Sequence, residues 1–345
     1  MNNFGKLKLY KDKPTIIAEV GVNHECDLKK AYKLISDAKV CGVDAVKFQT
    51  YKASELAIKK SPAYWDLSKE KTTTQRKLFE KYDKFEDEEF KNLYVECKKK
   101  KIIFMSTLFS VGLVNKLSKF LPLLKIASAD ITNVPLLRAV SLQKKPILLS
   151  TGASSVDEIK FALKVLDLPK KQVCIMHCVL NYPTKNENAN LNFISTLKKR
   201  FPKYIIGYSD HVAPDKELTS IEIAWNLGAQ IIEKHFTFDK TKKGNDHYHS
   251  ADKNNFLSFY DRMKKIIKLK GNFSKNLKKE ANSIKFARRS VVAQKDIKIG
   301  EIFSEYNLTT KRPGIYITAD NWDKIINKKS KRNIKADTPI KIKDF

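Results

Sequence analysis

The sequence lacks any uninterrupted apolar run of about 18 residues, the length that crosses a membrane as a helix. The segment from Met1 to Lys8 also has no apolar stretch of the kind found in secretory signal peptides. We therefore expect a cytoplasmic protein with no membrane partner.

Cysteine is scarce, with five residues in 345 and no regular spacing between them. This pattern is typical of reduced thiols in the cytoplasm and excludes a disulfide-rich scaffold. Cys174 and Cys178 fall on one predicted strand, where they either share a metal ion or, as we expect, are two small buried side chains.

Acidic residues are also few, because 38 Asp and Glu face 67 Lys and Arg, which gives a formal net charge of +29. Such a charge is typical of proteins that bind nucleic acid or a membrane surface. However, the lysines are spread along the chain and outnumber the arginines, whereas nucleic-acid readers gather arginine and aromatic residues on one face. We expect no nucleic-acid partner, although the charge would attract an anionic substrate.

Apolar residues make up 42% of the chain, which is enough for a full core. Strand and helix patterns alternate from about residue 14 to about residue 270. The strands are expected at Thr15–Val20, Val43–Phe48, Ile102–Met105, Leu123–Ala127, Pro146–Leu149, Val173–His177, Tyr204–Tyr208 and Gln230–Lys234. Eight such strands predict an α/β fold, a (β/α)8 TIM barrel.

Helix signals separate these strands. Asp27 is placed to cap a helix that Gly42 ends, and Ser155 with Glu158 forms a capping box. The long polar connection 51–84 is predicted to fold over the barrel mouth with short helices.

The pattern changes after Gly271. A linker is expected over 271–285, between a catalytic barrel at 1–270 and a small, mostly β domain at 286–345. Its strands are expected at 290–293, 301–303, 308–311 and 339–341.

Polar residues gather where the predicted barrel strands end, which is where barrel enzymes place their catalytic groups. Lys47 and Lys125 lie inside apolar strands, and a buried lysine is costly unless an anion or a carboxylate meets it. Together with nearby hydroxyls they predict a pocket for a phosphate or carboxylate ligand. The alternative is that each lysine pairs with a barrel glutamate.

Two neighbouring strands each end in a histidine, His211 and His235. Imidazoles at adjacent strand ends can hold one divalent first-row ion and leave open positions for substrate oxygen and water. His24 and His177 are weaker candidates, expected to orient backbone or carboxylate groups.

Several motifs together resemble the sialic acid synthases, which include the N-acetylneuraminate, legionaminate and pseudaminate synthases. The motifs are IIAEVGVNH at 16–24, VKFQT at 46–50, FMST at 104–107, KIAS at 125–128, LSTG at 149–152, GYSDH at 207–211 and IEKH at 232–235. The tail, with RSVVA at 289–293 and KRPG at 311–314, resembles the antifreeze-like (SAF) domain of the same family.

The resemblance implies that phosphoenolpyruvate condenses with an N-acylated mannose-type sugar to give a nine-carbon 2-keto acid and phosphate. Phosphoenolpyruvate would be held by Lys47, Thr107, Lys125, Ser128, Ser150 and Ser209. The metal on His211 and His235 is expected to be Mn²⁺, with Mg²⁺ or Co²⁺ as alternatives. The carboxylates available as catalytic groups are Glu19, Glu233 and Asp246.

The resemblance also implies a domain-swapped homodimer in which the SAF domain reaches the partner's barrel. The sugar would then contact Gln49, Tyr182 and Asp246, with Phe286 and Arg312 contributed in trans. The segment 244–250 departs from the family pattern, with Asn245 where proline is usual, so the sequence leaves the acceptor open.

Two alternative functions are also consistent with the sequence. One is a legionaminic or pseudaminic acid synthase that uses a diacetamido-trideoxy hexose. The other is a carbohydrate- or nucleic-acid-binding protein on an inactive barrel, which the intact set of strand-end residues disfavours.

Overall fold

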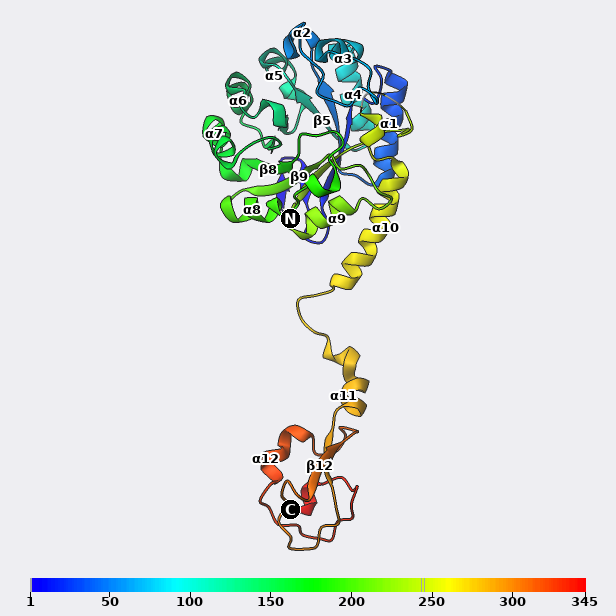
Figure 1. Cartoon of the computed structure of the whole chain (residues 1–345), viewed down its shortest axis with the longest axis vertical. Coiled ribbons are helices and arrows are strands. Elements are labelled where there is room, and N and C mark those ends of the chain that lie inside the picture. The colour runs from blue at the N-terminus through cyan, green and yellow to red at the C-terminus, as the bar shows by residue number, and fades with distance from the viewer. Residues whose placement is uncertain (1, 243, 245) are drawn as a thin grey trace. The chain divides into compact units, whose positions relative to one another are not determined.

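The computed structural model describes residues 2–242, 244 and 246–345; Met1, Lys243 and Asn245 lie outside the described residues. The chain divides into two compact units, Met1–Lys270 and Gly271–Phe345, which Figure 1 draws in one colour ramp. No helix among the described residues is long and apolar enough to cross a membrane.

The first unit is a closed barrel of parallel strands, ringed by helices (Figure 1). The strands are β3 (Thr15–Gly21), β4 (Ala45–Thr50), β5 (Ile103–Leu108), β6 (Leu124–Ile126), β7 (Ile147–Ser150), β8 (Val173–Cys178), β9 (Ile205–Asp210) and β10 (Ile231–His235). They pair in chain order, and β10 closes the barrel on β3. The predicted fold class is confirmed, with strand ends displaced by a few residues.

Each strand leads into a helix that packs on the outside of the barrel. The main helices are α1 (Leu28–Cys41), α4 (Asp87–Lys99), α5 (Val111–Leu117), α6 (Val134–Ser141), α7 (Val156–Leu166), α8 (Phe193–Arg200), α9 (Thr219–Asn226) and α10 (Lys253–Lys270). Asp27 caps α1, Gly42 ends it with a φ of 82°, and Ser155 with Glu158 forms the capping box of α7. These three predictions are confirmed.

Alternation along each strand divides the barrel side chains into two sets. Ile16, Ala18 and Val20 of β3 face the helices, whereas Ile17 belongs to an apolar cluster inside the barrel. That inner cluster includes Phe4 and Leu7, from the hairpin of β1 (Asn2–Phe4) and β2 (Leu7–Leu9). The hairpin therefore closes the amino end of the barrel with apolar side chains.

The long connection between β4 and α4 contains α2 (Ala53–Leu56) and α3 (Gln75–Tyr82). Its Lys69 carbonyl accepts a hydrogen bond from the backbone N–H of Gly244, at 3.1 Å, in the loop after β10. Because that loop follows a barrel strand, the connection reaches the carboxyl end of the barrel, as predicted.

The second unit has its own small core, which includes Val291, Phe303 and Ile334. Its strands β11 (Ser290–Ala293) and β12 (Leu308–Lys311) pair antiparallel, and its helices are α11 (Ala281–Ala287) and α12 (Trp322–Ile325). The strands predicted at 301–303 and 339–341 are wrong, because Ile302 and Pro339 each form only an isolated bridge.

Candidate active site

The carboxyl ends of the barrel strands carry polar side chains on the inner face. They lie two residues beyond the apolar inner positions, so the same alternation that buries Ile17 points Glu19 into the barrel mouth. The set is Glu19, Lys47, Thr107, Lys125, Ser150, Cys178, Ser209 and Glu233, all buried.

Lys47 is the centre of an ion-pair network in this set. Its ammonium is paired with Glu19, lies 3.7 Å from Glu233 Oε1 and donates to Thr107 Oγ1 at 2.9 Å. Burial opposes the charge on Lys47, but the two glutamates outweigh it and raise its pKa. Gln49 Nε2 donates to Glu19 Oε1 at 3.1 Å, which brings a predicted sugar-binding residue to the same network.

Lys125 joins the network through Glu233. Its Nζ lies 3.5 Å from Glu233 Oε1, which also accepts a hydrogen bond from Ser209 at 3.2 Å. Burial raises the pKa of Glu233, but Lys125 and Lys47 lower it to about 2, so this carboxylate is ionised. Burial instead raises the pKa of Glu19.

Both buried lysines therefore pair with barrel glutamates, as in the alternative named from the sequence. This pairing leaves the lysines able to bind an anion. An ammonium has three donors, and a phosphate or carboxylate can occupy those that the glutamates leave.

The hydroxyls on the neighbouring strand ends differ in their partners. Ser128 Oγ accepts from the backbone N–H of Gly152 at 2.9 Å, whereas the buried Ser150 hydroxyl has no hydrogen-bond partner among the described residues. Cys178 Sγ lies 3.7 Å from His211 Nδ1.

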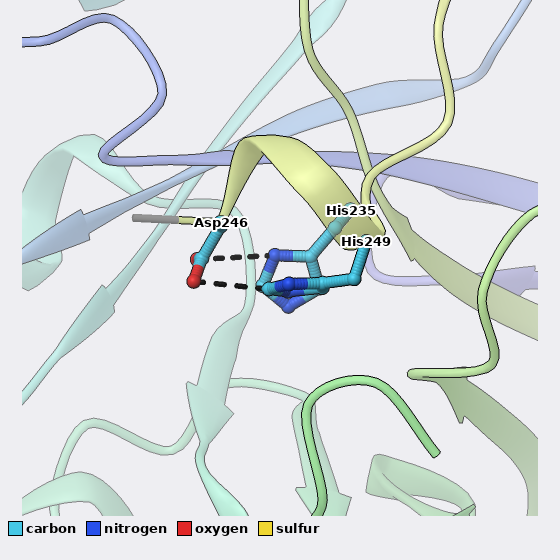
Figure 2. Close-up of side chains that lie close together, drawn as sticks. All are labelled: His235, Asp246 and His249. Atoms are coloured by element: carbon cyan, nitrogen blue, oxygen red, sulfur yellow. Dashed lines mark ion pairs between the residues drawn. The ribbon is translucent and has the colours of Figure 1, made fainter. Parts of the chain in front are cut away.

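A second cluster consists of imidazoles around Tyr182. The tyrosine ring centroid lies 4.1 Å from that of His211, 5.8 Å from that of His235 and 5.4 Å from that of His249. Asp246 lies beside two of them, with Oδ2 3.2 Å from His235 Nδ1 (Figure 2). These imidazoles hold the pKa of Asp246 below its usual value, against the effect of burial.

The donor set fits a divalent first-row ion. His211 Nδ1 lies 2.7 Å from the Val179 carbonyl, a contact that fixes the tautomer and leaves Nε2 for a ligand. His235 Nδ1 and both nitrogens of His249 are buried and have no hydrogen-bond partner among the described residues. One ligand atom each from His235, Asp246 and His249 lie within 4.8 Å of one another. Imidazole and carboxylate are the donors that such ions prefer.

Gly21 lies where the two clusters meet. A Cβ at this position, which has a φ of 53°, would lie 3.2 Å from Glu19 Oε1, 3.3 Å from Gln49 Nε2 and 3.5 Å from Asp246 Oδ2. The lysine–glutamate network and the histidine cluster are therefore parts of one site at the mouth of the barrel.

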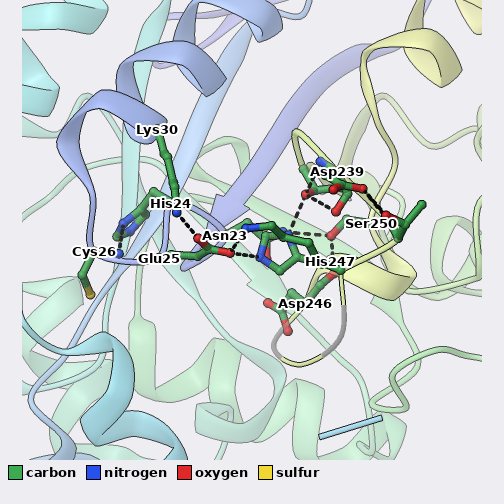
Figure 3. Close-up of polar contacts among 12 residues, drawn as sticks. Asn23, His24, Glu25, Cys26, Lys30, Asp239, Asp246, His247 and Ser250 are labelled. Atoms are coloured by element: carbon green, nitrogen blue, oxygen red, sulfur yellow. Dashed lines mark hydrogen bonds and ion pairs between the residues drawn. The ribbon is translucent and has the colours of Figure 1, made fainter.

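Hydrogen bonds and ion pairs join the loop after β3 to the loop after β10 (Figure 3). Glu25 pairs with Lys30, with Lys242 at 2.7 Å and with His247 Nε2 at 3.2 Å. Asn23 Nδ2 donates to Ser250 Oγ at 3.0 Å, and this hydroxyl donates to the Asp246 carbonyl at 2.5 Å. The backbone that carries Asp246 and His249 is thereby held against the first barrel strand.

Two histidines named from the sequence lie outside the site. His177 faces the helices, stacks on Tyr208 and bonds the Ala189 carbonyl at 2.8 Å. His24 stacks on Phe85, and burial lowers its pKa to about 4. Both are neutral packing residues in this structure.

Phe286 and Arg312 belong to the second unit, where both are exposed. The backbone N–H of Gly314 donates to the Lys285 carbonyl at 3.0 Å, so the segments that carry the two residues are neighbours. Their predicted contact with the sugar stays a prediction.

His249 and Cys178 were missed by the sequence-based assignment. Cys178 has the strand parity of Cys174 and Met176, both of which lie inside the barrel, and this alternation was the signal that could have found it. His249 follows Asp246 by three residues, in the short 3₁₀ turn His247–His249, and no strand pattern points to it.

Comparison with known proteins identifies a family for each of the two units. A model of the NeuB family matches residues 34–275, and a model of the SAF domain matches residues 288–345. The N,N'-diacetyllegionaminic acid synthase of Campylobacter jejuni is 39% identical over 95% of this chain and 99% of its own length. A pseudaminic acid synthase of the same species is 31% identical over 96% of both chains.

A solved structure is also similar. The N-acetylneuraminic acid synthetase of Leptospira borgpetersenii is 33% identical, has a TM-score of 0.70 and covers 81% of this chain and 93% of its own. With the barrel, the following small domain and both family models in agreement, this chain belongs to the NeuB family, whose sialic, legionaminic and pseudaminic acid synthases are its homologues.

Proposed function

We propose that this protein condenses phosphoenolpyruvate with an N-acylated amino sugar of the mannose type, and that it releases phosphate and a nine-carbon 2-keto sugar acid. The observation that carries the proposal is the joining of a buried lysine–glutamate network to a histidine cluster at one barrel mouth. Membership of the NeuB family supports it, because the relatives are named for three nine-carbon sugar acids of this kind.

Phosphoenolpyruvate is assigned to the lysine side of the site. Lys47 and Lys125 supply charged donors, and Thr107, Ser128, Ser150 and Ser209 supply hydroxyls for its phosphate and carboxylate. The Ser150 hydroxyl, which is buried without a hydrogen-bond partner among the described residues, supports this assignment.

The sugar is assigned to the histidine side. Gln49 contacts Glu19, whereas Tyr182 and Asp246 lie beside the imidazoles, and all three are assigned to orient the aldehyde and hydroxyls. A divalent ion on His211 and His235, for which we expect Mn²⁺ before Mg²⁺ or Co²⁺, would polarise the aldehyde as a Lewis acid.

The reaction balances with one water. C3 of phosphoenolpyruvate forms a bond to the sugar aldehyde carbon, water adds at C2, and the bond between C2 and the phosphate oxygen breaks. Glu19, Glu233 and Asp246 are the carboxylates placed to exchange protons with the water and the new hydroxyl. Of these, Glu19 contacts both Lys47, assigned to phosphoenolpyruvate, and Gln49, assigned to the sugar.

The SAF domain has a separate part in the proposal. We assign Phe286 and Arg312 to the sugar site of a partner subunit in a homodimer, because a guanidinium is a strong donor to sugar oxygens. Mixing Arg312→Ala chains with His211→Ala chains should restore activity, since one site of the heterodimer combines an intact barrel with an intact tail. No restoration in proven heterodimers would contradict the exchange between subunits.

Phosphate release tests the central proposal. The full chain with Mn²⁺ and phosphoenolpyruvate is assayed against N-acetylmannosamine and the two diacetamido-trideoxy hexoses, with mass spectrometry of the product. We expect phosphate and a nine-carbon acid in equal amounts with at least one acceptor, and no phosphate without acceptor. His211→Ala should lose the activity, whereas His177→Ala should keep it. Failure with every acceptor, or phosphate without a new acid, would overturn the proposal.

A further inference from the structure

His249 is placed to bind the same ligand as His235. Its side chain is fully buried, and neither of its ring nitrogens has a hydrogen-bond partner among the described residues. A buried imidazole without hydrogen bonds destabilises the folded protein, and a bound ligand can offset that cost.

The neighbouring histidine in the same 3₁₀ turn behaves differently. His247 Nδ1 is 2.7 Å from Thr237 Oγ1, and its Nε2 is 3.2 Å from Glu25 Oε1. Among the described residues, His247 therefore has one hydrogen bond, through Nδ1, and an ion pair with Glu25, whereas His249 has no hydrogen bond through either nitrogen.

Two distances among the three side chains are near those between ligands of one ion, one of them within the ideal range and the other slightly longer. Asp246 Oδ2 lies 3.2 Å from His235 Nδ1, and Asp246 Oδ1 lies 3.7 Å from His249 Nε2. Ligand atoms at about 2.1 Å from a metal are about 3.0 to 3.4 Å apart at adjacent positions. Figure 2 shows that the carboxylate faces both imidazoles.

We propose that His249 is a metal ligand, which together with His235, Asp246 and the His211 of the proposed function gives a set of three imidazoles and one carboxylate. This inference rests on the divalent ion of the proposed function and adds to it a residue of this chain. A set so rich in imidazole favours Fe²⁺, Co²⁺ or Zn²⁺, accommodates Mn²⁺ through its carboxylate, and disfavours Mg²⁺, which prefers oxygen.

Co²⁺ binding to the metal-stripped full chain tests the inference without any substrate. His249→Ala should weaken Co²⁺ binding at least tenfold in calorimetry and change its visible absorption bands. The matched control is His177→Ala, a buried histidine bonded to a backbone carbonyl outside the site, which should bind Co²⁺ within twofold of the unaltered protein. Excess Mg²⁺ should not displace Co²⁺ from the unaltered protein.

X-ray absorption of the unaltered Co²⁺ protein provides a second measurement that needs no variant to fold. Its imidazole scattering should count three rings, those of His211, His235 and His249. Two rings, or unchanged Co²⁺ affinity and spectrum in a folded His249→Ala variant, would overturn the inference. Because both measurements omit substrate, a failure of the phosphate-release assay is separate from either result.

Discussion

The two halves of the barrel interior are built on the same strands and have opposite chemistry. Ile17, Met105 and Leu148 fill the amino half, and the residues two positions further on are Glu19, Thr107 and Ser150. A step of two residues along each strand thus separates an apolar core from a polar, charged site. The comparison indicates that the inner residues of the amino half stabilise the fold, whereas those of the carboxyl half form the candidate site.

A charge placed in the apolar half should have the largest effect. Met105→Lys puts an ammonium among Ile17, Leu148 and Ile231, none of which can pair with it. We expect a loss of about 3–5 kcal/mol in the free energy of unfolding, or no folding at all, because the charge is uncompensated. Urea unfolding measures the change.

The matched control is Met105→Leu, which should cost less than about 1.5 kcal/mol because it nearly conserves volume. If the lysine variant is as stable as the leucine variant, the division of the interior into two halves is incorrect.

The reverse substitution in the charged half should affect binding more than folding. In Lys125→Met, Glu233 keeps Lys47 at 3.7 Å and Ser209 at 3.2 Å, so the network survives. Loss of a charged hydrogen bond should weaken phosphoenolpyruvate binding by about 1.5–3 kcal/mol in calorimetry. Lys47→Met should weaken it similarly and also destabilise the fold, because Glu19 loses its partner.

An exposed lysine on α7 provides the control for both variants. Lys160→Met should leave phosphoenolpyruvate binding unchanged, since this side chain lies on a helix outside the barrel. Unchanged binding in both Lys47→Met and Lys125→Met would contradict their assignment to the anion.

The sequence predicted much of this barrel because its signals are local. Alternating apolar residues, the Asp27 cap and the Ser155 capping box each determine an element within a few residues of chain. The strands expected at 301–303 and 339–341 failed because a short apolar run needs a partner of matching length, and each has a single bridge.

The site was predictable as far as it follows from strand ends. Lys47, Lys125, Glu233 and His235 all follow from that rule, but their roles remain predictions. Cys178 was placed on its strand from the sequence but was assigned to packing with Cys174, because the hydroxyl and imidazole groups that it lies beside come from other strands. His249 was hidden because only the three-dimensional path of the loop after β10 brings it to His235.

Substitutions at Gly207 and Ser150 test the same comparison with smaller expected changes in stability. A Cβ there would lie 2.7 Å from the Ile231 carbonyl oxygen and 3.0 Å from both Cys174 Sγ and Met176 Cγ. Gly207→Ala should therefore cost about 1–3 kcal/mol of stability through overpacking. Ser150→Ala, at the mouth, should not lower stability, because it removes a buried hydroxyl that has no hydrogen-bond partner among the described residues. Equal costs in urea unfolding would argue against a tightly packed amino half.

The smallest effect is expected at the loops of the mouth, and it depends on pH. Burial would raise the pKa of Glu25, but hydrogen bonds from Lys242 and Lys30 lower it to about 2. A carboxylate whose pKa is lower in the folded state adds stability above its unfolded value of 4.5, and that contribution is lost as pH falls toward 2.

Glu25→Gln removes the charge and nearly keeps the shape, so it should cost less than about 1 kcal/mol near pH 7. Its difference in melting temperature from the unaltered protein should shrink as pH is lowered below 4.5, whereas Met105→Leu should show a difference that does not change with pH. The exposed Glu187 serves as the surface control, and Glu187→Gln should leave the melting temperature unchanged. A Glu25→Gln difference that is the same at pH 7 and pH 3 would mean that packing, and not the ion pairs with Lys30 and Lys242, holds the two loops together.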